Sequence, residues 1–260
     1  MGQRGRTRGS LLGRSRGHRS ARERDRADPR REYGCRAIAP DPPGHGRSPS
    51  VPPDAYLPSR LAGLAAELLS ELGVDRAAFV GFSWGAQVGC SFAVRFPGRT
   101  TALVLIDGGY VQPPEPGTLA ACIEEAKAEA EEDSFESWDA YFAYERESLR
   151  RWTPAVEEAH RATMREKDGR VVPILDVEAL GAIMYGNRRE PAPATHPKIA
   201  AAGIPVLLVT YRVNAAVERF RSALPEARVE VVDDGIHDLV SFAPTRVAEA
   251  AGRFLVAQPP

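Results

Sequence analysis

Hydrophobic residues along this chain follow two alternating patterns, which together predict a parallel sheet covered by helices. Five short and almost continuously apolar runs have the length of strands: 35–40, 77–81, 101–106, 204–210 and 228–232. Apolar residues at helical spacing predict helices at 59–72, 84–96, 215–224 and 244–255. Continuous apolar strands that alternate with helices are typical of a parallel sheet buried on both faces. We therefore predict an α/β protein, with a mostly parallel sheet and helices on both of its faces.

The alternation stops at Tyr110, and the segment 111–197 is rich in helix signals and poor in strand signals. Residues of the helix-capping type predict four helices in it, which begin after Thr118, Ser134, Thr153 and Asp176. The second helix carries an aromatic face: Phe135, Trp138, Tyr141 and Phe142. We interpret the segment as a helical lid inserted after the strand that ends at Ile106. The aromatic face is interpreted as the seam on which the lid packs, rather than as a substrate subsite.

Residues 1–33 are rich in Arg, Gly and Ser and show no periodic hydrophobic pattern. Such a segment cannot bury enough apolar surface to fold alone, so we expect it to be disordered or poorly packed. A basic arm that binds nucleic acid is the alternative interpretation. We therefore divide the chain into an N-terminal segment at 1–33, an α/β core at 34–110 and 198–260, and a helical lid at 111–197.

Length and composition favour one domain with one insertion. With 260 residues and 43% hydrophobic content, the chain can bury one sizeable core. The formal net charge is -1, yet the first 36 residues hold twelve arginines against four acidic residues. The remainder is therefore acidic, which argues against nucleic-acid binding by the body of the protein.

The cysteines and the apolar runs favour a cytoplasmic protein. Cys35, Cys90 and Cys122 have no metal-ligand spacing, and their odd number argues against a disulfide framework. No apolar run reaches the roughly 18 residues that a membrane span needs. The basic N-terminus offers only Leu11 and Leu12 where a secretion signal needs an apolar segment of roughly 7 to 15 residues.

Ser83 lies in Gly81-Phe82-Ser83-Trp84-Gly85, between an apolar run and a predicted helix. A sharp strand-to-helix turn exposes the serine hydroxyl and directs the Trp84 N–H at an oxyanion formed beside Ser83. We interpret both glycines as the small residues that let the flanking backbone pack closely. A second Gly-x-Ser-x-Gly, around Ser15, lacks the flanking strand and helix, so we do not assign it a role. An ordinary glycine-rich turn with an incidental serine is the alternative for Ser83.

A serine hydroxyl is a weak nucleophile at neutral pH and needs a nearby base, for which the ordinary pKa of histidine is suited. Of the five histidines, His237 lies just beyond a late core strand, at the sheet edge where the Ser83 turn also lies. His45 is at that edge too. His160 and His196 lie in or beside the lid, and His18 in the N-terminal segment.

Residues 35–257 resemble the α/β-hydrolases. The resemblance rests on Ala-Pro-Asp-x-x-Gly-His-Gly-Arg-Ser at 39–48, the Ser83 turn, the helical insertion, and a late Gly-x-His-Asp loop at 235–238. It implies that Ser83 is the nucleophile and His237 the general base, because the family uses this order along the chain. It also implies that His45 shapes its loop.

The acid that orients the base is the least defined member of the predicted site. Many relatives place it after the strand that is 204–210 here, where this chain has no carboxylate before Glu218. Other relatives place it one core strand earlier, where Asp107 follows Ile106. We therefore predict Asp107, with a triad that lacks its acid as the alternative. Acidic residues in the loop of the base are expected to shape or solvate it: Asp233, Asp234 and Asp238.

The N-terminal segment departs from the family pattern. The family has three strands before Cys35, and the loop after the third supplies a second oxyanion donor, whereas this chain has an Arg-rich stretch there. Gly17-His18 resembles the family's dipeptide only weakly. We hypothesise that residues 1–33 replace the usual strands through a misassigned start or a reading-frame slip. Losing one oxyanion donor costs about 2.7 to 4 kcal/mol.

These observations predict a lidded serine hydrolase that acts on a small-molecule ester or related acyl substrate. Ser83, His237 and Asp107 form its catalytic triad, the Trp84 N–H binds the oxyanion, and no metal or organic cofactor is implied. A serine nucleophile disfavours the relatives that use aspartate for dehalogenation or epoxide opening. The alternative is a catalytically impaired or non-catalytic binding protein on the same fold. The sequence predicts neither the substrate's identity nor the oligomeric state.

Overall fold

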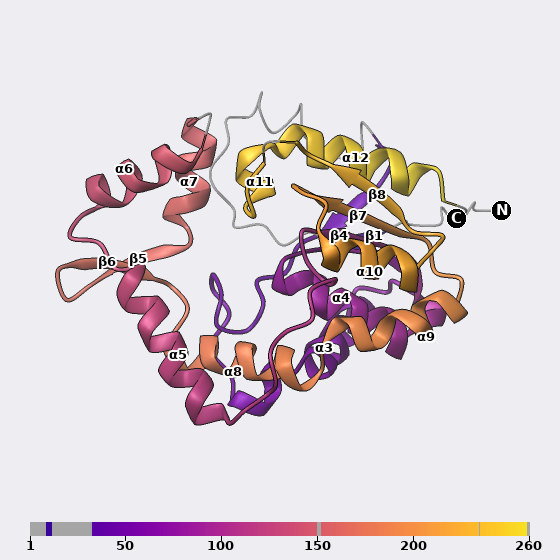
Figure 1. Ribbon diagram of the computed structural model, residues 1–260, viewed down its shortest axis with the longest axis horizontal. Coiled ribbons are helices and arrows are strands. Elements are labelled where there is room, and N and C mark those ends of the chain that lie inside the picture. The colour runs from indigo at the N-terminus through magenta and orange to yellow at the C-terminus, as the bar shows by residue number, and fades with distance from the viewer. Residues whose placement is uncertain (1–8, 12–32, 150–151, 234, 259–260) are drawn as a thin grey trace.

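A six-stranded sheet forms the centre of the protein, for which a computed structural model describes residues 9–11, 33–149, 152–233 and 235–258 (Figure 1). Its strands are β1 Gly9–Leu11, β2 Arg36–Ile38, β3 Ala77–Phe82, β4 Thr100–Ile106, β7 Val206–Thr210 and β8 Arg228–Val231. They lie in the order β2-β1-β3-β4-β7-β8, and every neighbouring pair is parallel. The predicted α/β fold with a parallel sheet is confirmed.

Helices cover both faces of the sheet (Figure 1). The helices of the core are α3 Pro58–Glu71, α4 Trp84–Arg95, α9 His196–Ala201, α10 Ala215–Ala223, α11 Leu239–Phe242 and α12 Pro244–Val256. Short 3-10 turns are η1 Pro53–Tyr56, η2 Pro97–Arg99 and η3 Ala192–Thr195. Leu103 and Leu105 of β4 pack with α3, α4 and α10, whereas Val104 and Ile106 pack with α12. Successive side chains of a strand point to opposite faces, so a continuous apolar run fills two cores at once.

The segment between β4 and η3, which the sequence predicts to be a lid and which keeps that name below, extends from the core (Figure 1). Its helices are α5 Leu119–Glu132, α6 Trp138–Ser148, α7 Pro154–Arg161 and α8 Val177–Arg189. Thr118 and Thr153 cap their helices through side-chain oxygens, and Asp176 precedes α8 as predicted. The cap of α6 was predicted wrongly: Ser137, not Ser134, accepts from the Ala140 N–H at 3.1 Å.

A β-hairpin in the lid corrects the expectation that this segment is poor in strands. β5 Met164–Lys167 pairs antiparallel with β6 Arg170–Pro173. Asp168 and Gly169 connect the strands, with φ of 52° and 75°. Asp-Gly between two strands is a strong hairpin signal, because both central residues of the favoured tight turn need positive φ. This dipeptide was the signal that could have revealed the hairpin.

Aromatic side chains form the lid's own small core. Tyr141 and Phe142 of α6 are each 3% exposed and pack with Val171 of the hairpin. Partly buried residues surround them: Phe135, Trp138, Trp152 and Met164. This packing supports the interpretation of the aromatic face as a seam within the lid.

The lid joins the core through α8. This helix packs on α5, where a Cβ at Gly181 would lie 2.7 Å from the Ile123 Cα, so only glycine allows such a close approach. It also packs on η1, through an apolar cluster of Ala179, Ala182, Ile183 and Tyr56. Trp84, the residue after Ser83, packs against this cluster.

The strand β1 departs from the expectation of an unstructured N-terminal segment. Gly9, Ser10 and Leu11 pair with β2 on one side and with β3 on the other. The run is too short to give a periodic pattern, and its hydrogen bonds come from neighbours distant in sequence. Except for Tyr33, the rest of residues 1–33 lies outside the described residues, as do Ser15 and Gly17-His18. The division of the chain at residues 33, 110 and 197 stays a prediction.

Among the helices in the described ranges, none combines the length and the apolar character that crossing a membrane requires.

Replacing Leu208 with alanine should lower the free energy of unfolding by about 2 to 5 kcal/mol, because it leaves a cavity in the core. Leu208 in β7 is fully buried, whereas Leu64 in α3 is 43% exposed. The matched variant Leu64→Ala removes the same atoms from the surface and should change stability by less than about 0.5 kcal/mol. Denaturant unfolding measures both, and equal losses would contradict the central position of Leu208.

Candidate active site

The backbone at Ser83 makes a strained turn between β3 and α4. Ser83 has φ 49° and ψ -114°, a conformation that residues other than glycine rarely adopt. Its N–H donates to the Ile106 carbonyl of β4 at 2.9 Å, and its carbonyl accepts from the Ala86 N–H at 3.0 Å. These two bonds hold the turn at the end of the sheet, with the serine side chain projecting from it.

Two glycines permit this turn, and they are not the pair predicted from the motif. A Cβ at Gly81 would lie 2.3 Å from the Gly85 carbonyl oxygen, and one at Gly108 would lie 2.3 Å from the Ser83 carbonyl oxygen. Real Cβ atoms do not come that close to backbone, so both positions require glycine. A Cβ at Gly85 would meet nothing within 4 Å, which corrects the expectation for that residue. Gly108 was missed, although it directly follows Asp107 at the end of the neighbouring strand.

The structure brings together the three side chains predicted to form the triad. His237 Nε2 lies 2.9 Å from Ser83 Oγ, and His237 Nδ1 lies 2.6 Å from Asp107 Oδ2. They come from the turn after β3, the end of β4 and the loop after β8. When the imidazole is neutral, Nδ1–H donates to the carboxylate, which leaves Nε2 to accept the serine proton.

Asp107 is buried, at 4% exposed, and held by hydrogen bonds from neighbouring residues. Tyr110 Oη and Thr210 Oγ1 each donate to Asp107 Oδ1 at 2.8 Å. The Asp107 N–H donates to the Val209 carbonyl at 2.7 Å. A buried carboxylate is costly unless it is hydrogen-bonded, and these donors together with His237 satisfy it.

Sequence reasoning missed Tyr110 and Thr210. Thr210 ends β7, the strand after which many relatives carry the acid, and here its hydroxyl donates to Asp107, which directly follows β4. A polar residue at the end of an otherwise apolar run was its only signal. Burial, together with the nearby Asp107, raises the pKa of Tyr110 to about 12, so its hydroxyl remains a donor at neutral pH.

The hydrogen bond to Asp107 raises the pKa of His237 above its usual value, although partial burial opposes the shift. The negative charges of Asp107 and Asp238 act in the same direction as that bond. The His237 side chain is 57% exposed, whereas that of Asp107 is 2% exposed. The arrangement therefore pairs a solvent-accessible base with a fixed internal charge.

Trp84 is the first residue of α4, so its backbone N–H has no acceptor within the helix. Its indole ring stacks on the His45 ring, with 5.2 Å between centroids and 17° between planes. His45 Nδ1 lies 3.0 Å from the Pro43 carbonyl, within the loop of His45 itself. His45 therefore lies beside the Ser83 turn but bonds to its own loop, as the resemblance implied.

The other candidate residues lie in different surroundings. Asp238 Oδ1 accepts from the Ser241 N–H at 3.1 Å and caps α11, while Asp233 is exposed and Asp234 lies outside the described residues. Buried His196 has Nε2 2.8 Å from the Gly109 carbonyl. His160 Nδ1 lies 3.1 Å from the Tyr141 hydroxyl in the lid.

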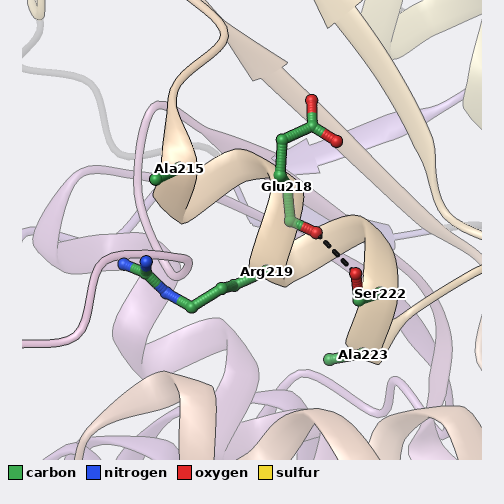
Figure 2. Close-up of a pocket in the computed structure, with 5 residues that line it drawn as sticks. All are labelled: Ala215, Glu218, Arg219, Ser222 and Ala223. Atoms are coloured by element: carbon green, nitrogen blue, oxygen red, sulfur yellow. Dashed lines mark hydrogen bonds between the residues drawn. The ribbon is translucent and has the colours of Figure 1, made fainter.

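Other polar and hollow regions lie apart from the triad residues. In the described part of the chain, no three His, Cys, Asp or Glu side chains are grouped as metal ligands. Figure 2 shows an open hollow on α10, lined by Ala215, Glu218, Arg219, Ser222 and Ala223. None of these residues belongs to the candidate site, and the Ser222 hydroxyl there donates to the Glu218 carbonyl at 2.9 Å.

Fold and site together define an α/β hydrolase, because a serine on a strand-to-helix turn, a histidine and a carboxylate meet at the carboxyl edge of a parallel sheet. The model of the alpha/beta hydrolase family matches residues 20–250, and the chain belongs to this family. The resemblance recognised in the sequence is confirmed.

Comparisons with known proteins agree on the family. Epoxide hydrolase 2 of Siraitia grosvenorii is 40% identical over 72 residues, 27% of this chain and 23% of that protein. A putative non-heme haloperoxidase of Mycobacterium phage D29 is 38% identical over 81 residues, 31% of this chain and 29% of that protein. The matched segments thus span less than a third of the length of these curated relatives.

Solved structures match nearly the whole chain. E-2-(acetamidomethylene)succinate hydrolase superposes with a TM-score of 0.71 and 22% identity, covering 96% of this chain and 91% of that one. The enol-lactonase from Burkholderia xenovorans LB400 gives a TM-score of 0.67 and 20% identity, covering 98% and 94%. At these identities the likeness establishes the fold.

Gly81→Ala should disrupt the Ser83 turn, whereas Gly85→Ala should not. The first places a methyl group against backbone and should destabilise the protein by about 1 to 3 kcal/mol. The second has open space and adds a better helix former, so its stability should change by less than about 1 kcal/mol. Thermal unfolding of both variants measures the difference, and a Gly81→Ala protein as stable as Gly85→Ala would contradict the packing described.

Proposed function

We propose that this protein is a serine hydrolase that cleaves a small carboxylic ester or a related acyl compound through an acyl-enzyme on Ser83. The observation that carries the proposal is the unbroken line of hydrogen bonds from Ser83 Oγ through His237 to Asp107. A hydroxyl within reach of a histidine, which a buried carboxylate orients, is the arrangement that activates serine for attack on a carbonyl carbon.

In the proposed reaction, Ser83 Oγ attacks the substrate carbonyl while His237 Nε2 takes the hydroxyl proton. Asp107 stabilises the imidazolium and keeps the ring oriented. His237 then returns the proton to the leaving alcohol, and an acyl-enzyme remains on Ser83. Water, activated by His237 in the same way, releases the acid and restores the serine.

The beginning of α4 is suited to stabilise the charge that develops on the carbonyl oxygen. The Trp84 N–H, which has no acceptor within α4, and the positive end of the helix dipole both lie next to Ser83. The loop that would supply a second donor by family resemblance falls in the residues after β1, outside the described residues.

The relatives are named for several reactions, and those on acyl groups agree best with the site. The structural neighbours include proteins described as an enol-lactonase and as carboxylesterases. A lactone is a cyclic ester, so both names describe cleavage of an acyl–oxygen bond. The epoxide hydrolases among the sequence relatives support the proposed reaction less, because a serine nucleophile disfavours epoxide opening.

A fluorophosphonate probe tests the nucleophile directly. We expect the folded wild-type protein to be labelled, and Ser83→Ala to lose all labelling, because only an activated serine attacks the probe at a useful rate. Ser222→Ala is the matched control: its hydroxyl bonds to a backbone carbonyl in the hollow of Figure 2, so labelling should persist. A folded wild-type protein that resists labelling would favour the alternative, a binding protein without catalysis.

Asp107→Asn tests the acid through both rate and pH dependence. Activity should rise with pH through the raised pKa of His237, because only the neutral ring accepts the serine proton. Asparagine removes the main cause of that raised pKa, so the acid limb of kcat/KM should move to lower pH. The rate should fall by about 10²- to 10⁴-fold, because the carboxylate no longer fixes the tautomer. An unchanged rate and pH profile in a folded variant would refute the role of Asp107.

A further inference from the structure

His160 is a lid residue that lies between carboxylates of the lid and of the catalytic loop. It is on α7, and its side chain is only 11% exposed. On the lid side, Nδ1 lies 3.1 Å from the Tyr141 hydroxyl and 3.4 Å from Glu145 Oε2, both on α6. On the core side, Nε2 lies 3.6 Å from Asp238 Oδ2. Asp238 directly follows His237, so one imidazole connects the lid to the loop of the base.

Asp238 is held in a fixed position to receive this contact. Its Oδ1 caps α11 through the Ser241 N–H, which leaves Oδ2 free to face His160. The next residue, Leu239, is fully buried, and its N–H donates to the His237 carbonyl at 2.8 Å. Movement of the Asp238 side chain would therefore cost the cap of α11, and a lid held to Asp238 is held to the backbone of His237.

The groups around His160 are acidic. Burial raises the pKa of Glu145, and the charges of Asp238 and Asp133 raise it further, whereas His160 opposes the shift. Tyr141 remains a neutral phenol, because burial raises its pKa to about 12. The charge of a protonated His160 acts against these effects, so an imidazolium relieves the repulsion within the cluster.

The ring nitrogens show which charge state completes the contact. His160 Nε2 is buried and forms no hydrogen bond within the described residues, and its 3.6 Å distance to Asp238 suits an ion pair but is too long for a hydrogen bond. A neutral imidazole donates from one nitrogen only, whereas an imidazolium donates from both. Protonated His160 can therefore donate to Glu145 and Asp238 at the same time, once the distance between Nε2 and Asp238 Oδ2 shortens by a few tenths of an ångström.

We propose that His160 is a positioning residue that latches the lid onto the catalytic loop, by placing an imidazolium between Glu145 of the lid and Asp238 beside His237. The consequence for catalysis rests on the proposed function. The charge of Asp238 contributes to the raised pKa of His237. A closed latch, in which the His160 imidazolium neutralises that charge, therefore lowers the pKa of His237. When the lid opens, this effect of His160 is lost. The latch itself is a contact between elements and exists whether or not the protein hydrolyses esters.

Hydrogen exchange of backbone amides in α7 and α11 tests the latch. We compare wild type, His160→Phe, Asp238→Asn and the double variant at pH 6. Phenylalanine keeps the packing of the ring against Trp152, whose centroid lies 5.4 Å away, and asparagine keeps an oxygen for the α11 cap. We expect each single variant to speed exchange in both helices by about 5-fold, a typical size for coupling between sites.

Non-additivity distinguishes a latch from two separate structural roles. Both substitutions remove the same contact, so the double variant should exchange no faster than either single variant. Arg161→Gln is the matched control on α7: its guanidinium lies over the Trp138 and Phe142 rings of the lid, so exchange in α11 should not change.

Several outcomes would overturn the latch. Additive effects, or exchange in α11 that is unchanged in folded His160→Phe, would reduce His160 to a packing residue. Should His160→Phe fail to fold, Asp238→Asn alone decides, because unchanged exchange in α7 would exclude the contact. The hydrogen-exchange measurements do not require an active enzyme. A wild-type protein that resists the fluorophosphonate probe would therefore refute the proposed function, while hydrogen exchange would still test the latch. In active enzyme, loss of the latch should raise KM by about 5-fold, with a smaller change in kcat.

Discussion

The strained backbone at Ser83 is the constraint on which the rest of the site depends. A residue with positive φ persists only where its surroundings fix it, and here the neighbouring strand does so. The Ile106 carbonyl binds the Ser83 N–H, and Gly108 leaves room for the Ser83 carbonyl. The Ser83 turn and the end of β4 are thus one packed unit. The position of Asp107 within that unit follows from the same contacts.

Strand register explains how residues distant in sequence form this unit. Phe82 pairs with Ile106, and Ile106 pairs with Val209, so the three strands end level with one another. The residues that follow these paired positions therefore lie next to one another: Ser83, Asp107 and Thr210. A carboxylate at the end of β4 and a hydroxyl at the end of β7 are therefore close enough to bond, and the acid does not need to stand on β7. Because Asp107 is buried, its charge acts through a medium of low polarity on a base that remains open to solvent.

The sequence predicted those elements and site residues whose signals come from residues close together along the chain. Continuous apolar runs revealed β3, β4 and β7, and the strand ends then pointed to Ser83 and Asp107, which the structure places together with His237. Contacts between distant segments gave no comparable signal. Nothing near Gly108 in the sequence indicates that a Cβ there would strike Ser83, and β1 exists through pairing with residues 27 and 68 positions further along the chain. Gly85 is the opposite case: the motif suggested that close packing requires glycine there, but the structure has open space around it.

Two of the contacts between lid and core differ in physical character. Along α8, Ile183 and Tyr56 pack beside Trp84, and Glu190 at the end of the helix accepts hydrogen bonds from the Ser59 N–H and hydroxyl at 2.7 Å. The contact at His160 is the approach of Nε2 to Asp238 Oδ2 at 3.6 Å, which is an ion pair when the imidazole is protonated. The aromatic core of the lid joins α6 to the hairpin, and His160 of α7 packs against its Tyr141 and Trp152 rings. Because α8 makes more contacts with the core than His160 does, release of the proposed latch would free the α7 end of the lid first. That end lies against the loop that carries His237.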